Sequence, residues 1–186
     1  MPPVNIIVLN GSSGSGKTTL ARALQEVFTE PYLRFGIDIV YAMLPDRFRD
    51  WHNPANEQMV KRALMGMNHS AATMADAGNY IILDTMLVNR AAVLDCARAV
   101  AKHRAFFIGL FCDEAELRKR AGARGKGLAE TALKQAQHIH AHGHYDLKFN
   151  TAGKAPGIMA EQIKLMTESK MAPVAFEQLR AQKSGA

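Results

Sequence analysis

The chain contains little cysteine and no long apolar segment. Its two cysteines, Cys96 and Cys112, lie in apolar surroundings without CxxC spacing, and we interpret them as reduced thiols of the core. The segment 1–10 lacks the basic region and the long apolar stretch of a secretory signal, and no later segment approaches the ~20 apolar residues that span a bilayer. We therefore expect a cytoplasmic protein that is neither secreted nor inserted in a membrane.

Aromatic residues are absent where the positive charge gathers. The formal net charge of the 186 residues is +6, and much of it is concentrated in the segment 118–126. No aromatic side chain stands among these basic residues to stack on bases, so the cluster suits a phosphate-handling site better than a nucleic-acid groove. A hydrophobic content of 48% is enough for one buried core. We therefore expect residues 1–186 to form a single domain without a nucleic-acid partner.

Apolar strands alternate with amphipathic helices along the chain. The first apolar run, 4–10, leads through a glycine-rich segment into a helix at 18–28. Further strands are expected at 32–37, 80–83, 105–111 and 145–149, and helices at 38–43, 57–77, 90–103, 114–120, 128–140 and 156–168. The segment 45–56 is expected to be a loop, and 170–186 a loosely docked, frayed helix. This alternation predicts an α/β fold of three layers, with a five-stranded parallel sheet between helices.

The segment 11–18, GSSGSGKT, matches the phosphate-binding P-loop pattern GxxxxGK[ST]. Glycine permits backbone angles that turn successive N–H groups toward phosphate oxygens, and the following helix N-terminus adds partial positive charge. Lys17 is expected to reach the β- and γ-phosphates, and the Thr18 hydroxyl to bind Mg²⁺. A chance match is the alternative, but the motif lies between a strand and an amphipathic helix, as this mechanism requires. The residues expected to bind ATP are Gly11, Ser12, Ser13, Gly14, Ser15, Gly16, Lys17, Thr18 and Thr19.

Two acidic residues follow other strands of the predicted sheet. Asp38 comes after the second strand and Asp84 after the third. Ligands of an open parallel sheet bind outside the carboxyl ends of its strands, so both carboxylates can converge on the phosphates. We interpret Asp38 as the general base that orients the acceptor hydroxyl, and Asp84 as a ligand of Mg²⁺, directly or through water. The structural alternative for each is an ordinary helix N-cap.

A basic, glycine-broken segment at about 118–128 is expected to form a lid. Glycines allow such a segment to open and close, and arginine suits it because its fixed fork of donors matches a phosphoryl group. We interpret Arg120 and Arg124 as catalytic residues that contact the transferring phosphoryl group. The preceding basic residues of the helix end, Arg118 and Lys119, are better explained as solvent-exposed charges that complement the helix dipole.

Histidines stand at every second position from His138 to His144. A pair of metal ligands on a helix needs a spacing of four residues, and the second member of each such pair falls near or beyond the expected helix end. We therefore interpret them as solvent-facing or substrate-lining residues rather than as a metal site. The methionines of the segment 59–74 are interpreted as core filler, with an adaptable substrate wall as the alternative.

Several motifs together resemble the chloramphenicol phosphotransferase-like kinases. They begin with the runs LNGSSGSGKT at 9–18, EPYL at 30–33 and FGID at 35–38. They continue in the same order with Cys112-Asp113, Arg120, Arg124-Gly125, Lys134-Gln135-Ala136, His140 and Tyr145-Asp146. The resemblance covers most of residues 4–151. It goes beyond a generic P-loop, because the FGID run and the stretch from the lid to Tyr145-Asp146 are part of it.

The resemblance implies an ATP-dependent kinase of the nucleotide- and shikimate-kinase-like fold that phosphorylates a hydroxyl of a small molecule, chloramphenicol or a related acceptor. It implies the catalytic base at Asp38 and lid contacts to the ATP phosphates at Arg120 and Arg124. Gly127 stands where the family pattern has a further lid arginine, and Asn150 where it has an acid after the last strand.

Two other functions remain open at this point. One is a nucleotide or polynucleotide kinase, which the net charge and the same fold would suit. The other is a nucleotide-binding NTPase switch without a phosphoryl acceptor, against which the carboxylate at Asp38 argues.

Overall fold

The computed structural model describes residues 4–49, 53–123, 125, 127–169 and 171–182. The strands are β1 (Ile6–Asn10), β2 (Tyr32–Gly36), β3 (Tyr80–Thr85), β4 (Ala105–Phe111) and β5 (Leu147–Asn150). The α-helices are α1 (Lys17–Val27), α2 (Ile37–Ala42), α3 (Glu57–Asp76), α4 (Arg90–Ala99), α5 (Glu114–Gly122), α6 (Leu128–His138), α7 (Pro156–Glu168) and α8 (Ala175–Ala181). Two short 3₁₀ turns, η1 (Asp46–Phe48) and η2 (Pro54–Asn56), lie in the segment that the sequence predicts as a loop.

The strands form one parallel sheet in the order β2-β3-β1-β4-β5, which confirms the predicted α/β fold. The central strand β1 places Leu9 beside Asp84 of β3 and beside Ile108 of β4. Because the strands are parallel, their carboxyl ends meet at one edge of the sheet. The P-loop and the strand-end acids therefore lie at the same edge.

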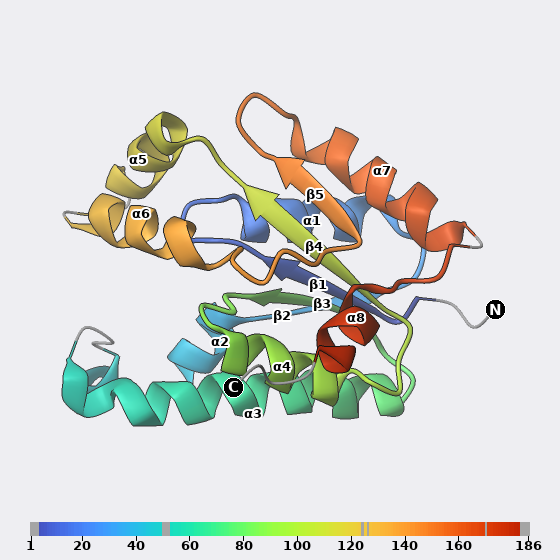
Figure 1. Ribbon diagram of the computed structural model, residues 1–186, viewed down its shortest axis with the longest axis horizontal. Coiled ribbons are helices and arrows are strands. Elements are labelled where there is room, and N and C mark those ends of the chain that lie inside the picture. Colours follow the sequence, from blue (N-terminus) through green and yellow to red (C-terminus); the bar gives the residue numbers. More distant parts are fainter. Residues whose placement is uncertain (1–3, 50–52, 124, 126, 170, 183–186) are drawn as a thin grey trace.

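The two faces of the sheet are covered by different helices (Figure 1). Alternate residues of β1 point to opposite sides: Ile6 and Val8 pack against α3, α4 and α8, whereas Ile7 and Leu9 pack against α1 and α7. All four side chains are fully buried, so β1 is apolar on both faces, as a central parallel strand requires. Among the described residues, no helix has the length and apolar character needed to cross a membrane.

Helices α5 and α6 stand apart from the sheet as a helical hairpin at the left of Figure 1. The hairpin has its own small apolar cluster, in which Leu117 and Ala121 of α5 meet Ala132 of α6. Cys112 packs at the margin of this cluster, and Cys96 is buried in the main core; both thiols are free. The hairpin coincides with the region expected to form the lid, although its helices extend beyond 118–128.

The C-terminal segment is packed more firmly than the sequence predicts. Helix α8 buries Ala175, Phe176 and Leu179 in the core that covers β1 and β4. The ring of Phe176 stacks on Phe107 of β4, with the ring centroids 4.5 Å apart. The expectation of a frayed helix is wrong for residues 175–181, because these apolar side chains, spaced for one helix face, find a partner face on the sheet.

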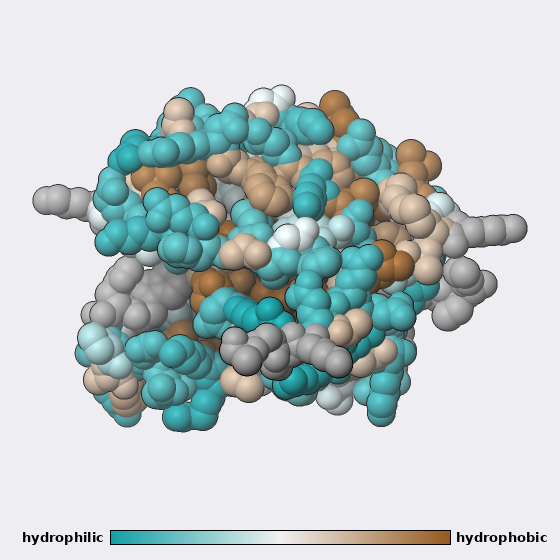
Figure 2. All heavy atoms as spheres, in the orientation of Figure 1, coloured by the Kyte–Doolittle hydropathy of each residue, from teal (hydrophilic) through white to brown (hydrophobic). Residues whose placement is uncertain are grey.

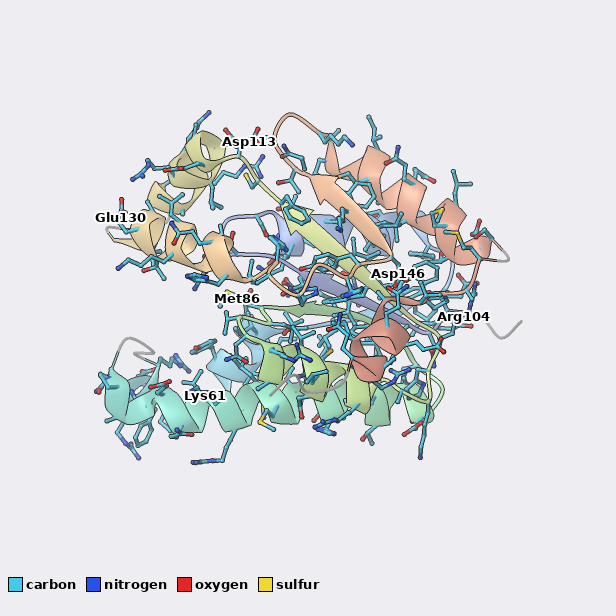
Figure 3. All side chains as sticks on the ribbon, viewed as in Figure 1. Lys61, Met86, Arg104, Asp113, Glu130 and Asp146 are labelled. Carbon is cyan, nitrogen blue, oxygen red and sulfur yellow. The ribbon has the colours of Figure 1, made fainter. Side chains whose placement is uncertain are left out.

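Asp146 lies just before β5, which begins at Leu147 rather than at the predicted residue 145, and it helps to hold α8. Its carboxylate accepts hydrogen bonds from the backbone N–H groups of Phe107, Val174 and Ala175, at 2.8, 2.7 and 3.0 Å. These bonds tie the entrance of β5 to β4 and to the first turn of α8. Asp146, which Figure 3 labels beside α8, is therefore a structural link rather than a strand residue.

Candidate active site

The P-loop follows β1 without a gap and ends in α1. Gly14 and Gly16 have φ angles of 80° and 92°, which only glycine adopts readily. At Gly11 the constraint is space, because a Cβ there would lie 2.5 Å from Ser15 Oγ and 2.6 Å from the carbonyl oxygen of Leu110. The glycine pattern that the sequence displays thus has a separate steric reason at each position.

Lys17 is the first residue of α1, and its side chain is folded back into the P-loop. The ammonium donates to the backbone carbonyls of Gly11 at 2.8 Å and Ser12 at 3.0 Å, and the residue is buried. A buried cation at a helix N-terminus forms a concentrated positive site, to which the helix dipole adds. The arrangement suits an anion such as a phosphate group.

Thr18 and Asp84 are brought together, as the prediction of a shared metal site requires. The Thr18 hydroxyl donates to Asp84 Oδ2 at 2.6 Å, and Asp84 is 2% exposed. Arg34 Nη1 lies 3.9 Å from the same oxygen. A hydroxyl and a carboxylate beside a phosphate loop are oxygen donors of the kind Mg²⁺ prefers. The chain therefore offers a fitting place for the ion, although its role as a metal site stays a prediction.

Asp38 lies in the first turn of α2, on the side of the sheet edge next to Asp84. The strand register pairs Gly36 with Asp84, so Asp38, two residues after the end of β2, lies near Asp84, the last but one residue of β3. The prediction that β3 ends before Asp84 is therefore wrong by two residues. Neither acid is an N-cap: α2 is capped by Gly36, and Asp84 lies within β3. The N-cap alternatives are therefore wrong for both residues, whereas the proposed chemical roles remain open.

One cleft of about 660 Å³ contains these groups. It is lined by Ser13, Gly14, Gly16, Lys17, Thr18, Thr19, Arg22, Ile37, Asp38, Tyr41, Arg49, Asp84 and Met86. Figure 2 shows a hollow with hydrophobic residues on its floor between the lid hairpin and the α2–α4 half, and Figure 3 labels Met86 between α6 and α4. Burial of the Tyr41 hydroxyl raises its pKa to about 12, so this phenol is neutral throughout the physiological range. The cleft combines an anion site, two carboxylates and an apolar wall.

Arg120 of α5 reaches the base of the P-loop. Its guanidinium donates to Glu116, and it also donates to the side chain and backbone oxygens of Thr151, both at 3.1 Å. Thr151 in turn donates to the backbone carbonyl of Ser15 at 3.0 Å. The guanidinium is thus held beside the phosphate loop by three hydrogen bonds. Arg124, the other predicted lid arginine, lies outside the described residues.

A second hollow, of about 400 Å³, lies on the other side of the P-loop. It is lined by Gly14, Gly16, Thr19, Arg120, Thr151, Lys154, Pro156 and Met159. Arg118 takes no part in either hollow, because it is paired with Glu114 and Glu130 on the outside of the hairpin. This agrees with the interpretation of Arg118 as an exposed helix-end charge.

Sequence reasoning missed a hydrogen-bonded chain beneath the lid. Asn10 Nδ2 donates to the Tyr145 hydroxyl at 2.8 Å, and that hydroxyl contacts His140 Nδ1 at 2.7 Å. Asn10 Oδ1 also accepts from the backbone N–H of Leu87 at 2.8 Å. The Tyr145 ring lies where a Cβ of Gly109 would be, 2.8 Å away, so glycine is required there. The sequence signal that could have revealed this chain is Asn10, a polar residue at the end of the otherwise apolar strand β1.

The alternating histidines have separate structural partners. His140 stacks on Phe111 with centroids 3.8 Å apart, His142 stacks on Phe107, and His144 contacts Gln178 of α8. Burial lowers the pKa of both His140 and His142 to about 4. These two imidazoles are therefore neutral at pH 7, which lets His140 Nδ1 accept a hydrogen bond from the Tyr145 hydroxyl.

The comparison with known proteins agrees with this arrangement. The sequence matches the chloramphenicol phosphotransferase-like protein family over residues 4–168. The chain belongs to this family. The resemblance stated from the motifs is thereby confirmed, and the match includes the P-loop, the strand-end acids and the lid hairpin.

Individual relatives of this chloramphenicol phosphotransferase-like protein are distant. A Mycobacterium tuberculosis protein with the provisional name O-phosphotransferase, found in two strains, is 24% identical and covers 97% of this chain and 89% of its own. The structure of the APS kinase of that organism with AMPPNP and APS has a TM-score of 0.67 at 16% identity, covering 91% and 100% of the two chains. Shikimate kinase from Acinetobacter baumannii with shikimate has a TM-score of 0.64 at 14% identity, covering 90% and 96%. The fold is that of the P-loop kinases.

Proposed function

We propose that this chloramphenicol phosphotransferase-like protein is a cytoplasmic, ATP-dependent kinase that transfers the γ-phosphoryl group to a hydroxyl of a small molecule. The observation that carries the proposal is the single cleft in which the P-loop, the Thr18–Asp84 pair and Asp38 meet. A nucleotide-binding switch has no need of an acceptor carboxylate in this position. Chloramphenicol or a related alcohol is the first candidate acceptor, and the apolar wall of the cleft is consistent with such a molecule.

The donor side of the proposed reaction is assigned to the P-loop. Backbone N–H groups of the loop and the buried ammonium of Lys17 bind the phosphates and neutralise their charge. Arg120 adds a second cation at the base of the loop, and we assign the same task to Arg124 of the lid. The second hollow, between Arg120 and Met159, is a suitable place for the nucleoside. Mg²⁺, bound by Thr18 and Asp84, would neutralise charge between the β- and γ-phosphates.

Asp38 is assigned to the acceptor hydroxyl. Its side chain is exposed and lines the cleft, so its carboxylate can accept the hydroxyl proton as the new P–O bond forms. The γ-phosphoryl group leaves the β-phosphate oxygen, which keeps the electron pair of the broken bond. ADP and a phosphorylated alcohol are the products. Closure of the lid hairpin would exclude water, which otherwise competes as the acceptor.

The deciding experiment is an ADP-release assay over antibiotics, sugars, nucleosides, nucleoside monophosphates and amino alcohols. Lys17→Ala is the blank. With the acceptor so found, Asp38→Asn is expected to lower kcat by at least about 100-fold, because general-base catalysis contributes about 10²–10⁴-fold. ATP affinity is expected to stay within about twofold, because Asp38 is assigned to the acceptor and not to the donor. Glu161→Gln, which removes an exposed carboxylate on α7, is the matched control.

Full turnover by Asp38→Asn would show that another group accepts the proton. ATP binding without phosphorylation of any alcohol would instead support the nucleotide-binding switch. Phosphorylation confined to nucleotides would support a nucleotide kinase. Phosphorylation confined to oligonucleotide ends would support a polynucleotide kinase, which should also bind oligonucleotides in a salt-sensitive manner.

A further inference from the structure

The tip of the P-loop is covered by both helices of the lid hairpin. From α6, Gln135 Oε1 accepts a hydrogen bond from the backbone N–H of Ser13 at 3.0 Å. From α5, Leu117 and Ala121 lie so close that a Cβ at Gly14 would be 3.2 Å from one and 3.5 Å from the other. The loop that would bind phosphate is therefore in direct contact with the hairpin.

The Ser13 N–H belongs to the set of backbone donors that cradle phosphate in a P-loop. A half-buried backbone N–H needs an acceptor, and in this structure the carboxamide of Gln135 supplies it. Lys17 shows the same behaviour, since its ammonium is bound by carbonyls of the loop itself. In both cases a protein oxygen stands where a phosphate oxygen is expected.

The position of Ser13 indicates which phosphate is concerned. Ser13 lines the cleft that contains Asp38, whereas it is not among the residues that line the second hollow beside Arg120. The Ser13 N–H therefore lies on the side of the proposed acceptor, where the terminal phosphoryl group of a nucleoside triphosphate would be.

Gln135 is suited to a change of partner. Its carboxamide has an oxygen that accepts and an amino group that donates two hydrogen bonds. A rotation of the side chain exchanges one for the other without moving the helix. The end of α6 is anchored, because Asn10 Nδ2 donates to the Ile139 carbonyl at 3.4 Å and His140 contacts the Tyr145 hydroxyl. Gln135 lies one helical turn before this anchor.

We propose that Gln135 is a further phosphate-contacting residue, which distinguishes a nucleoside triphosphate from a diphosphate. Its oxygen holds the Ser13 N–H while the loop is empty, and yields that N–H to the terminal phosphate. The Gln135 amino group then donates to the same phosphate. The inference rests on the proposed function, because it assumes that the P-loop binds a nucleoside triphosphate.

Calorimetric titration with ADP and with the non-hydrolysable analogue AMPPNP tests this inference. Gln135→Met keeps the length of the side chain but removes its hydrogen bonds. It is expected to raise the Kd of AMPPNP by about tenfold, as loss of a hydrogen bond to a charged group implies, and to leave that of ADP within about twofold. Gln137→Met, an exposed change on the same helix, is the matched control and should alter neither Kd.

Gln135→Glu is the second variant. It keeps the acceptor for the Ser13 N–H, but it loses the two donors and adds a negative charge. It should therefore weaken AMPPNP binding more than Gln135→Met does. It should also weaken AMPPNP binding more than it weakens ADP binding. An equal change for both nucleotides, or no change for either, would overturn the inference and leave the kinase proposal intact. If the unaltered chain binds neither nucleotide, the proposed function fails, and this inference fails with it.

Discussion

At the scale of single residues, the Thr18–Asp84 contact joins two parts of the cleft. Thr18 belongs to the first turn of α1 and Asp84 to the end of β3, and the hydroxyl and carboxylate are 2.6 Å apart. Asp84 is almost completely buried, and the Thr18 hydroxyl and the Arg34 guanidinium lie beside its carboxylate. A buried carboxylate that loses a hydrogen-bond donor is destabilised unless a cation takes its place.

Thr18→Val is therefore expected to lower kinase activity by at least about 100-fold and to raise the Mg²⁺ concentration needed for half-maximal activity. Thr18→Ser keeps the hydroxyl and should retain most of the activity. The measurement is ADP release against Mg²⁺ concentration at saturating ATP. Thr73→Val, on the exposed face of α3, controls for the loss of a threonine hydroxyl. Equal Mg²⁺ dependence in Thr18→Val and the unaltered chain would contradict the assignment.

At the scale of elements, α8 and the lid hairpin differ in how they are held. Helix α8 buries one apolar face against β4 and α4, and Asp146 accepts hydrogen bonds from its first turn. The lid hairpin has a small apolar cluster of its own and contacts the rest of the molecule through the P-loop and through the hydrogen bonds of Arg120 to Thr151. The first element is therefore part of the main core, whereas the second has a separate core of its own.

Phe176→Ala in α8 is expected to reduce the free energy of unfolding by about 3–5 kcal/mol, as is typical for truncation of a buried aromatic side chain. The residue is 4% exposed and stacks on Phe107. Chemical denaturation measures the change. Glu177→Ala, the exposed neighbour on the same helix, should change it by no more than about 0.5 kcal/mol. A loss below about 1 kcal/mol in Phe176→Ala would mean that α8 is only loosely attached in solution.

At the scale of the whole molecule, the parallel sheet gathers the site at one edge and places the histidines beside it. His140 and His142 belong to the segment that leads from α6 to β5, and their rings pack on aromatic side chains of β4. Burial lowers the pKa of each from 6.5 to about 4. In the unfolded chain these groups take up protons near pH 6.5, whereas in the folded chain they do so only near pH 4.

The free energy of unfolding should therefore decrease as the pH falls from about 6.5 to about 4, because the unfolded chain binds protons that the folded chain does not. Chemical denaturation at pH 7 and pH 5 measures the difference. His142→Asn keeps an acceptor for the His144 N–H but does not titrate, so the difference should shrink. His138→Asn, an exposed change at the end of α6, should leave it unaltered. An equal loss in His142→Asn and the unaltered chain would contradict the assignment.

The sequence by itself determined the P-loop, the α/β fold and the positions of Asp38 and Asp84 at strand ends. These features are local: a glycine pattern reports backbone angles, apolar periodicity reports the face that one element buries, and a residue after a strand lies at the carboxyl edge of a parallel sheet. The same local signals led to a wrong prediction for α8, because how firmly this helix packs depends on the surface of the sheet and of α4 against which it lies.

Only the tertiary structure decided which distant residues meet. Ser13 and Gln135 are separated by 122 positions and Asn10 and Tyr145 by 135, and each pair is joined by one hydrogen bond. Such contacts depend on the strand order, the rotation of each helix and the space left by residues such as Gly109. No local pattern carries that information, because each partner fits its own element equally well without the other.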